Sequence, residues 1–180
     1  MSNDKLIKSK IAGIAVTLVV AVCILSWIFT APYMTSQGRA LSNQGFDRTP
    51  GVIIGGTLAP SPDDFSSLNE SVPGPMMMKL SGFPPFVTYL LWVGTPDGVI
   101  SASRPDGGYW SQRLREGGGD GLLRIGDSTY EMNATEIHGD ERLAMMGKWA
   151  AKANMPLDQT LYQGGAPLHD WEVFFWAPRS

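Results

Sequence analysis

The sequence has almost no cysteine and little histidine. Its single cysteine, Cys23, lies in an apolar N-terminal run, so no disulfide can form within the rest of the chain. The two histidines, His138 and His169, form no cluster with the spacing of a zinc site. The G-x-S-x-G, H-E-x-x-H and P-loop patterns are also missing. These absences exclude the common hydrolase, zinc and nucleoside-triphosphate sites that such motifs build.

A basic excess is missing as well. The 180 residues include 14 lysines and arginines against 17 aspartates and glutamates, which gives a formal net charge of −3. This balance argues against a nucleic-acid partner. A hydrophobic content of 43% is enough for a packed core, and 21 glycines with 13 prolines favour many turns and short strands over a helical bundle.

The longest apolar run, Ile11–Phe29, contains no charged residue. A helix over this run spans about 28 Å, close to the ~30 Å hydrocarbon core of a bilayer. We therefore predict one transmembrane helix over residues 11–31, with Trp27 near its end. A cleaved signal peptide is the alternative, but the run is long for one and no small-residue cleavage site follows it.

The charges around this run predict its orientation. Three lysines precede it, at positions 5, 8 and 10, and only Arg39 follows closely. By the positive-inside rule, residues 1–10 stay in the cytoplasm and the anchor sits in the inner or plasma membrane. A polar stalk is expected over residues 32–50, and a periplasmic domain over residues 51–180.

Short strands dominate the expected domain. The strand segments are Phe86–Val93, Val99–Arg104, Leu122–Ile125, Thr129–Ile137 and Trp171–Trp176. The turn Thr95–Gly98 joins the first two as a hairpin, with Gly98 expected at a positive φ, and the turn at Gly126 joins a second hairpin. The segment Ala59–Pro75 is expected to be a surface loop with one short helical turn.

One helix is predicted between the second hairpin and the last strand. Asp140 and Glu141 mark its beginning, apolar residues follow at helical spacing, and Asn154 and Pro156 end it. The predicted fold is mainly β, of the α+β class: a small antiparallel barrel of about six short strands with one packed helix, preceded by the transmembrane helix.

The order of these elements resembles the split-barrel proteins that use FMN or the deazaflavin F420, such as deazaflavin-dependent nitroreductases and pyridoxamine-phosphate oxidases. The residues that carry the resemblance are Ser103, Arg104, Gly107, Gly108, Trp110, Arg113, Leu114, Gly126, Ala134 and Glu136. The resemblance covers about half of the chain. It departs from the family where Glu116–Gly121 replaces the usual Asn-x-x-x-Pro turn, and the early cofactor-binding hairpin has no counterpart in Gly51–Leu80.

The resemblance implies a flavin- or deazaflavin-type oxidoreductase, or a derivative of one. It implies that Arg104 and Arg113 hold the phosphate of FMN or F420, beside Ser103, Gly107 and Gly108, with Trp110 against the ring. Because a fold can be kept while its cofactor is lost, no cofactor is the alternative. A non-catalytic accessory subunit of a larger membrane complex, docked through exposed aromatic residues and the Ala59–Pro75 loop, is the second function class. A periplasmic domain that binds a small anion is a third.

Four arginines support an anion site in any of these readings. Arg104, Arg113, Arg115 and Arg124 follow one another along the two hairpins and their connection, and could meet at one rim. The alternative is a set of solvated arginines paired with nearby carboxylates such as Asp106, Glu116 and Asp120.

Several other residues have a structural and a chemical interpretation. The five tryptophans beyond the N-terminal run, Trp110 included, are expected mainly in the core or at an interface. Met76, Met77 and Met78 suggest copper, but neighbouring strand residues point to opposite faces, so apolar packing is preferred. His138 is expected as a surface or helix-capping residue, because no nucleophile motif accompanies it. No metal site is predicted.

Overall fold

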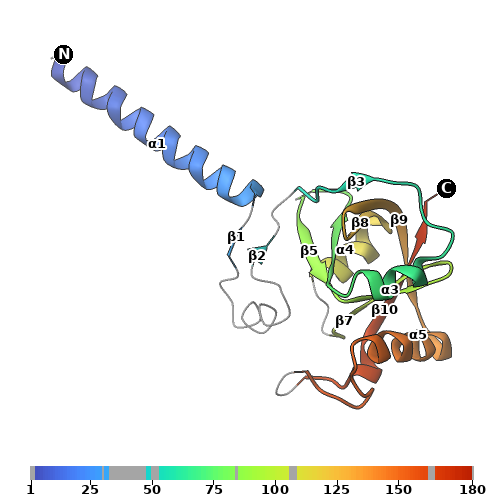
Figure 1. Cartoon of the computed structure of the whole chain (residues 1–180). Coiled ribbons are helices and arrows are strands. Elements are labelled where there is room, and N and C mark those ends of the chain that lie inside the picture. Colours follow the sequence, from blue (N-terminus) through green and yellow to red (C-terminus); the bar gives the residue numbers. More distant parts are fainter. Residues whose placement is uncertain are drawn as a thin grey trace.

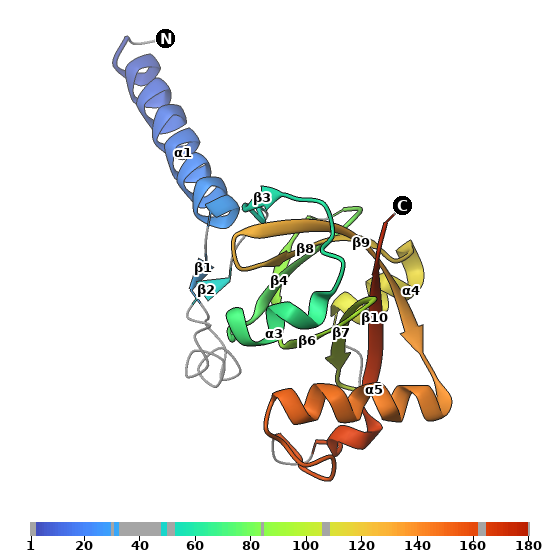
Figure 2. The ribbon, with the colours of Figure 1, turned by 45° about the vertical axis from the view of Figure 1, so that its right-hand side comes forward.

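The computed structural model describes residues 3–29, 31–32, 48–49, 53–83, 85–105, 109–161 and 165–179. The first element, α1 (Asn3–Phe29), extends away from the rest of the chain in both views (Figures 1 and 2), and its described side chains, residues 10–25, are exposed. Among the described residues, no helix is both long enough and apolar enough to cross a membrane, so the structure gives the predicted anchor no support.

Most of the expected stalk lies outside the described residues. Its ends form a short antiparallel pair, β1 (Ala31–Pro32) with β2 (Arg48–Thr49). The surface loop predicted over residues 59–75 contains η1 (Phe65–Ser67) and α3 (Leu68–Ser71), which confirms its short helical turn. Asp64 accepts a hydrogen bond from the Ser66 backbone N–H at 2.7 Å and so caps η1.

The domain is built on one mainly antiparallel sheet. Its path runs β5-β4-β8-β9-β10-β7-β6, with β3 (Thr57–Leu58) paired to β9 in parallel. The strands are β4 (Met76–Leu80), β5 (Val87–Leu90), β6 (Trp92–Thr95), β7 (Gly98–Ser103), β8 (Asp120–Ile125), β9 (Ser128–Ile137) and β10 (Glu172–Pro178). The two predicted hairpins are confirmed as β6–β7 and β8–β9.

The single strand predicted over Phe86–Val93 is wrong, because the chain breaks at Leu91. Residues before the break pair with β4, and residues after it pair with β7, at the opposite end of the sheet path. One residue therefore links the two ends of the path, and this requires the sheet to curl. The long β9 allows the curl, because its first part pairs with β8 and its last part pairs with β10. The two pairings share only Met132 and Asn133. The result is the half-barrel expected of a split-barrel fold.

Alternation along the strands divides the core into two parts. The interior of the half-barrel holds large side chains, namely Phe65, Met76, Met78, Leu123, Tyr130, Met132, Phe174 and Trp176 among others. The outer face of β6, β7 and β10 packs against α5 (Gly139–Lys152), which lies across that end of the sheet in Figure 2. In β10, Val173 faces α5 while Phe174 and Trp176 face the interior.

The predicted helix is confirmed as α5, and Asn154 ends it with a φ of 54°. A second helix was not predicted: α4 (Tyr109–Gly117) closes one end of the half-barrel with Trp110 and Leu114. These two residues are four apart, so they lie on one helical face. The sequence pattern did not indicate this short helix, because a run of glycines, which disfavour helix, follows it directly.

Gly98 corrects one prediction about turn chemistry. It does not take the expected positive φ. A Cβ at this position would instead collide with the carbonyl oxygen of Trp176 on β10. Glycine is required here because two backbones approach closely.

Candidate functional site

The predicted cofactor residues lie where β7 ends and α4 begins. Ser103 is 4% exposed, and its hydroxyl faces that of Ser111 on α4, with the two oxygens 3.4 Å apart. Trp110 is 9% exposed and meets Phe174 edge to face, with ring centroids 5.0 Å apart. Both side chains therefore serve the interior of the half-barrel, as predicted for the tryptophans. Gly107 and Gly108 lie outside the described residues.

Two arginines of the predicted set, Arg104 and Arg113, lie near this end of the half-barrel. Arg113 donates from Nη2 to the carbonyl oxygen of Ser81 at 2.9 Å, and its guanidinium lies 5.1 Å from the centre of the Phe86 ring. Arg104 is half-buried at the end of β7.

Arg115 is engaged at the surface of the protein, with its side chain 37% exposed. It donates from Nε and Nη2 to both carboxylate oxygens of Glu136, at 2.7 and 2.6 Å, and also lies 2.9 Å from Glu172. The hydrogen bond from Arg115 lowers the pKa of the Glu136 carboxyl, and the same bond raises the pKa of Arg115. This bidentate pair joins α4 to β9 and β10.

Arg124 is likewise engaged, on a different part of the sheet. It donates to the backbone oxygens of Ile54 and Gly126 at 3.1 and 3.0 Å, and it lies 3.5 Å from Asp127. The four arginines therefore do not meet at one rim. Arg115 pairs with Glu136 and Glu172 and not with the carboxylates expected from sequence proximity, because strand pairing brings these two closer.

The described residues fit a bound flavin or deazaflavin poorly. A ring has no described aromatic surface to stack on at Trp110, because Phe174 and the barrel interior cover it. The Ser103 hydroxyl is turned inward, and Arg115 already neutralises two carboxylates. The described residues form no groove at this end that would take the ring.

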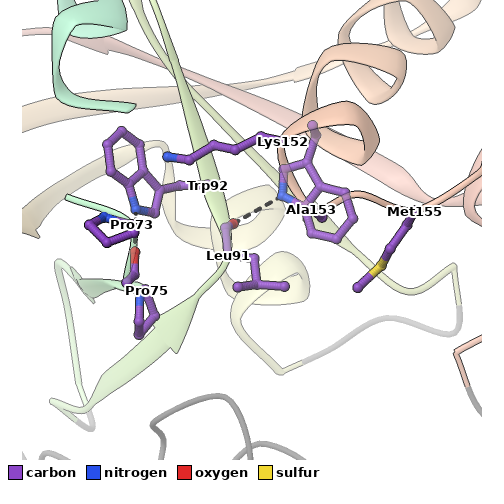
Figure 3. A pocket seen from close by; sticks show the side chains of 9 residues that line it. Pro73, Pro75, Leu91, Trp92, Lys152, Ala153 and Met155 are labelled. Carbon is purple, nitrogen blue, oxygen red and sulfur yellow. Dashed lines mark hydrogen bonds between the residues drawn. The ribbon is translucent and has the colours of Figure 1, made fainter. Parts of the chain in front are cut away.

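A pocket of about 290 Å³ opens elsewhere, between the β5–β6 break and the end of α5 (Figure 3). Its walls are Pro73, Gly74, Pro75, Leu91, Trp92, Trp149, Lys152, Ala153 and Met155. Each indole N–H is already bonded to backbone: Trp92 donates to the Gly74 oxygen at 2.9 Å, and Trp149 donates to the Leu91 oxygen at 3.0 Å. The indoles therefore offer the pocket apolar surface and no free donor.

Lys152 crosses this pocket from α5 toward Trp92, as Figure 3 shows. Its Nζ lies 3.3 Å from the centre of the Trp92 ring and donates to Asn69 Oδ1 at 3.0 Å. Burial of the amine lowers the pKa of Lys152 to about 8. Asn69 is itself fixed by two bonds to the Gly94 backbone, at 2.7 and 2.9 Å.

Sequence reasoning did not find this site. Asn69, Trp92 and Lys152 are far apart in the chain, and none belongs to a recognisable motif. The one signal that the sequence offered was the position of Lys152, a charged residue in the last turn of the predicted helix, next to the apolar face that packs on the domain.

The methionines and His138, the other residues singled out in the sequence, contribute to packing or to a helix end. Met76 and Met78 are buried in the interior on β4, while Met77 faces the other way, which confirms apolar packing. His138 is the N-cap residue of α5, at the position predicted for it. The described residues contain no group of His, Cys, Asp and Glu that could hold a metal ion.

Comparisons with known proteins give loose structural likenesses. No family model matches the chain, and no curated protein matches it. An F420 reductase overlays with a TM-score of 0.44 at 13% identity, over 67% of this chain and 97% of that one. The heme storage protein HutZ from Vibrio cholerae overlays with a TM-score of 0.41 at 14% identity, over 63% and 87%. Neither overlay is close enough to support a function.

Proposed function

We propose that this chain is a derivative of the flavin and deazaflavin split-barrel proteins that acts as a non-catalytic subunit of a larger complex. The observation that carries the proposal is the use of Ser103 and Trp110 as interior packing residues. The site that the resemblance implies would turn the Ser103 hydroxyl toward the phosphate and Trp110 toward the ring, whereas here both side chains join α4 to the half-barrel. The sequence resemblance supplies the relationship to the family.

An aromatic corner supports a docking role. We use this name for Phe83, Phe86 and Tyr109. Phe83 is 90% exposed and Tyr109 is 57% exposed, and the rings of Phe86 and Tyr109 lie 5.0 Å apart. Large exposed aromatic groups beside a cation are typical of the centre of protein interfaces, and Arg113 lies over Phe86. The corner suits a partner protein with an apolar patch.

Cofactor titration tests the non-catalytic part of the proposal. The full-length chain, extracted gently from its native membrane fraction, is supplied separately with FMN and F420, and its absorbance is measured after removal of free cofactor. We expect no retained chromophore. Stoichiometric retention that is lost in Arg104→Ala or Arg113→Ala would overturn the proposal in favour of a redox enzyme.

Site-specific crosslinking tests the docking part. A photoreactive residue placed at position 83 is expected to crosslink one defined partner in the cell. The matched control is position 58, because Leu58 is also exposed, at 65%, but lies outside the aromatic corner. Equal crosslinking from both positions, or none from position 83, would contradict docking through this corner.

An active oxidoreductase is the second candidate. It is favoured by Arg104 and Arg113 at one end of the half-barrel, next to the Gly107–Gly108 pair of the sequence. In such an enzyme the cofactor would supply the hydride or electron chemistry, and the protein would bind and orient it. The titration above separates the two candidates.

Membrane attachment remains a proposal from the sequence. The uncharged run Ile11–Phe29 is longer than the part of α1 whose side chains the structure describes, residues 10–25. We propose an inner-membrane location with the domain in the periplasm. Alkaline carbonate extraction tests the attachment, and a reporter fused after the last residue tests the orientation. Release of the full-length chain by carbonate would sink the anchor, and reporter activity only in the cytoplasm would reverse the orientation.

A further inference from the structure

We infer that the pocket beneath Lys152 binds a small monocarboxylate with an apolar or aromatic body, with its carboxylate at the Lys152 amine. This inference concerns a different site from the aromatic corner. It does not depend on a role as a docking subunit.

The hydrogen-bonding groups of the pocket point to an acceptor ligand. The side chains of proline, leucine, alanine and methionine carry no N–H or O–H donor. Both indole N–H groups are already bonded to backbone oxygens. The ammonium of Lys152 has three N–H groups, and Asn69 takes one of them. Lys152 is therefore the lining side chain with donors to spare.

The charge of the pocket favours an anion. Among the described residues, no carboxylate forms an ion pair with Lys152, and its neighbours Asn69 and Trp92 are neutral. The amine is partly buried, and the lowered pKa reflects the loss of hydration around the charged form. A ligand carboxylate would restore a charge-assisted hydrogen bond to this amine. Phosphate is a poorer match, because its several oxygens need more donors than one partly used ammonium offers.

The walls define the rest of the ligand. In Figure 3, Met155 stands on one side of the pocket and Pro73 and Pro75 stand opposite, with Leu91 between them. Trp149, on α5, also lines the pocket. Flat and apolar surfaces of this kind favour a ring or a short hydrocarbon body. A volume of about 290 Å³ lies at the lower end of ligand pockets, which limits the body to about one ring.

Ligand-observed ¹⁹F NMR on the full-length chain tests the inference. The probe is 4-fluorobenzoate, and 4-fluorobenzyl alcohol is the neutral analogue with the same ring. Binding broadens the ¹⁹F signal of each probe. From the broadening we expect an apparent affinity at least about tenfold higher for the benzoate than for the alcohol, as a charge-assisted hydrogen bond predicts. Inorganic phosphate in excess is expected not to displace the probe.

Two lysine variants assign the effect to the site. Lys152→Met keeps the length of the side chain and removes its donors, so benzoate affinity is expected to fall about tenfold. Lys148→Met is the matched control, since Lys148 is exposed on the same helix, and it is expected to stay within about twofold. Thermal unfolding of both variants shows that they fold.

Each contrary outcome is decisive. Equal affinity for the acid and the alcohol, or displacement by phosphate, would overturn the carboxylate assignment. Unchanged benzoate binding in a folded Lys152→Met variant would overturn the site. Absence of benzoate binding to the wild-type chain would leave Lys152 as a structural tie between α5 and Asn69, and the inference would be wrong.

Discussion

Replacement of Gly94 by alanine is expected to destabilise the domain strongly, because β6 passes directly beneath η1. A Cβ at position 94 would overlap the carbonyl oxygen of Phe65 and lie 2.7 Å from its carbonyl carbon. Both contacts are backbone, so no side-chain rotation can relieve them. Phe65 is 1% exposed and sits in the interior cluster, so η1 cannot move outward without disturbing the core.

The expected loss of stability follows from the displacement of η1. Moving η1 by about 1 Å to admit the methyl group is an overpacking change, which typically costs about 1–3 kcal/mol. The same shift strains the two hydrogen bonds between Asn69 and the Gly94 backbone, and each contributes about 1 kcal/mol. We expect a loss of about 3 kcal/mol in the free energy of unfolding, and a fall in Tm of about 10 °C for a domain of this size.

Urea and thermal unfolding, followed by near-ultraviolet circular dichroism, measure this loss. Gly147→Ala is the matched control, because a Cβ there meets nothing within 4 Å in the middle of α5. Alanine in a helix interior stabilises by about 0.5–1 kcal/mol relative to glycine. A Gly94→Ala variant that melts within a degree or so of the wild type would refute the packing argument. An equal loss in both variants would show that the effect does not come from η1.

Further predictions concern three polar contacts, at Arg115, Ser101 and Lys152. Arg115→Met should lower stability at neutral pH by about 1 kcal/mol, the upper end for an exposed ion pair, because it leaves Glu136 without its bidentate partner. Since the pKa of Glu136 is lowered in the folded state, this contribution exists above its ordinary pKa and is lost as the pH falls through the folded value, so the difference between variant and wild type should shrink in acid urea titrations. Ser101→Ala should cost about 1–3 kcal/mol in chemical unfolding, because the buried N–H of Trp176 donates to this hydroxyl at 2.9 Å; a near-zero change would contradict that. Lys152 has a folded pKa of about 8 against an ordinary 10.5, so the unfolded chain binds more protons between these values, and wild-type stability should rise with pH there. The rise, on the order of 1 kcal/mol after allowance for solvent screening, should be missing in Lys152→Met.

The local pattern of the sequence was enough to determine the two hairpins and α5. Period-2 alternation between glycine-containing turns specified β6–β7 and β8–β9, and helical spacing between Asp140 and Asn154 specified α5. These signals are local because turn geometry and face periodicity depend on neighbouring residues. The same reasoning placed Trp92, Trp149, Trp171 and Trp176 in the core, where all four are buried.

Only the tertiary structure decided the rest. The pattern of Phe86–Val93 predicts one strand. The segment breaks at Leu91 because its first half pairs with β4 and its second half pairs with β7, which lies at the other end of the sheet path. The sequence suggests that Arg115 binds an anion, whereas in the fold strand pairing brings Glu136 and Glu172 beside it. Asn69, Trp92 and Lys152 meet because the sheet curls and α5 covers its outer face. Contacts between residues far apart in the chain leave no periodic trace in the sequence, and both the Lys152 pocket and the packing of the predicted cofactor residues depend on such contacts.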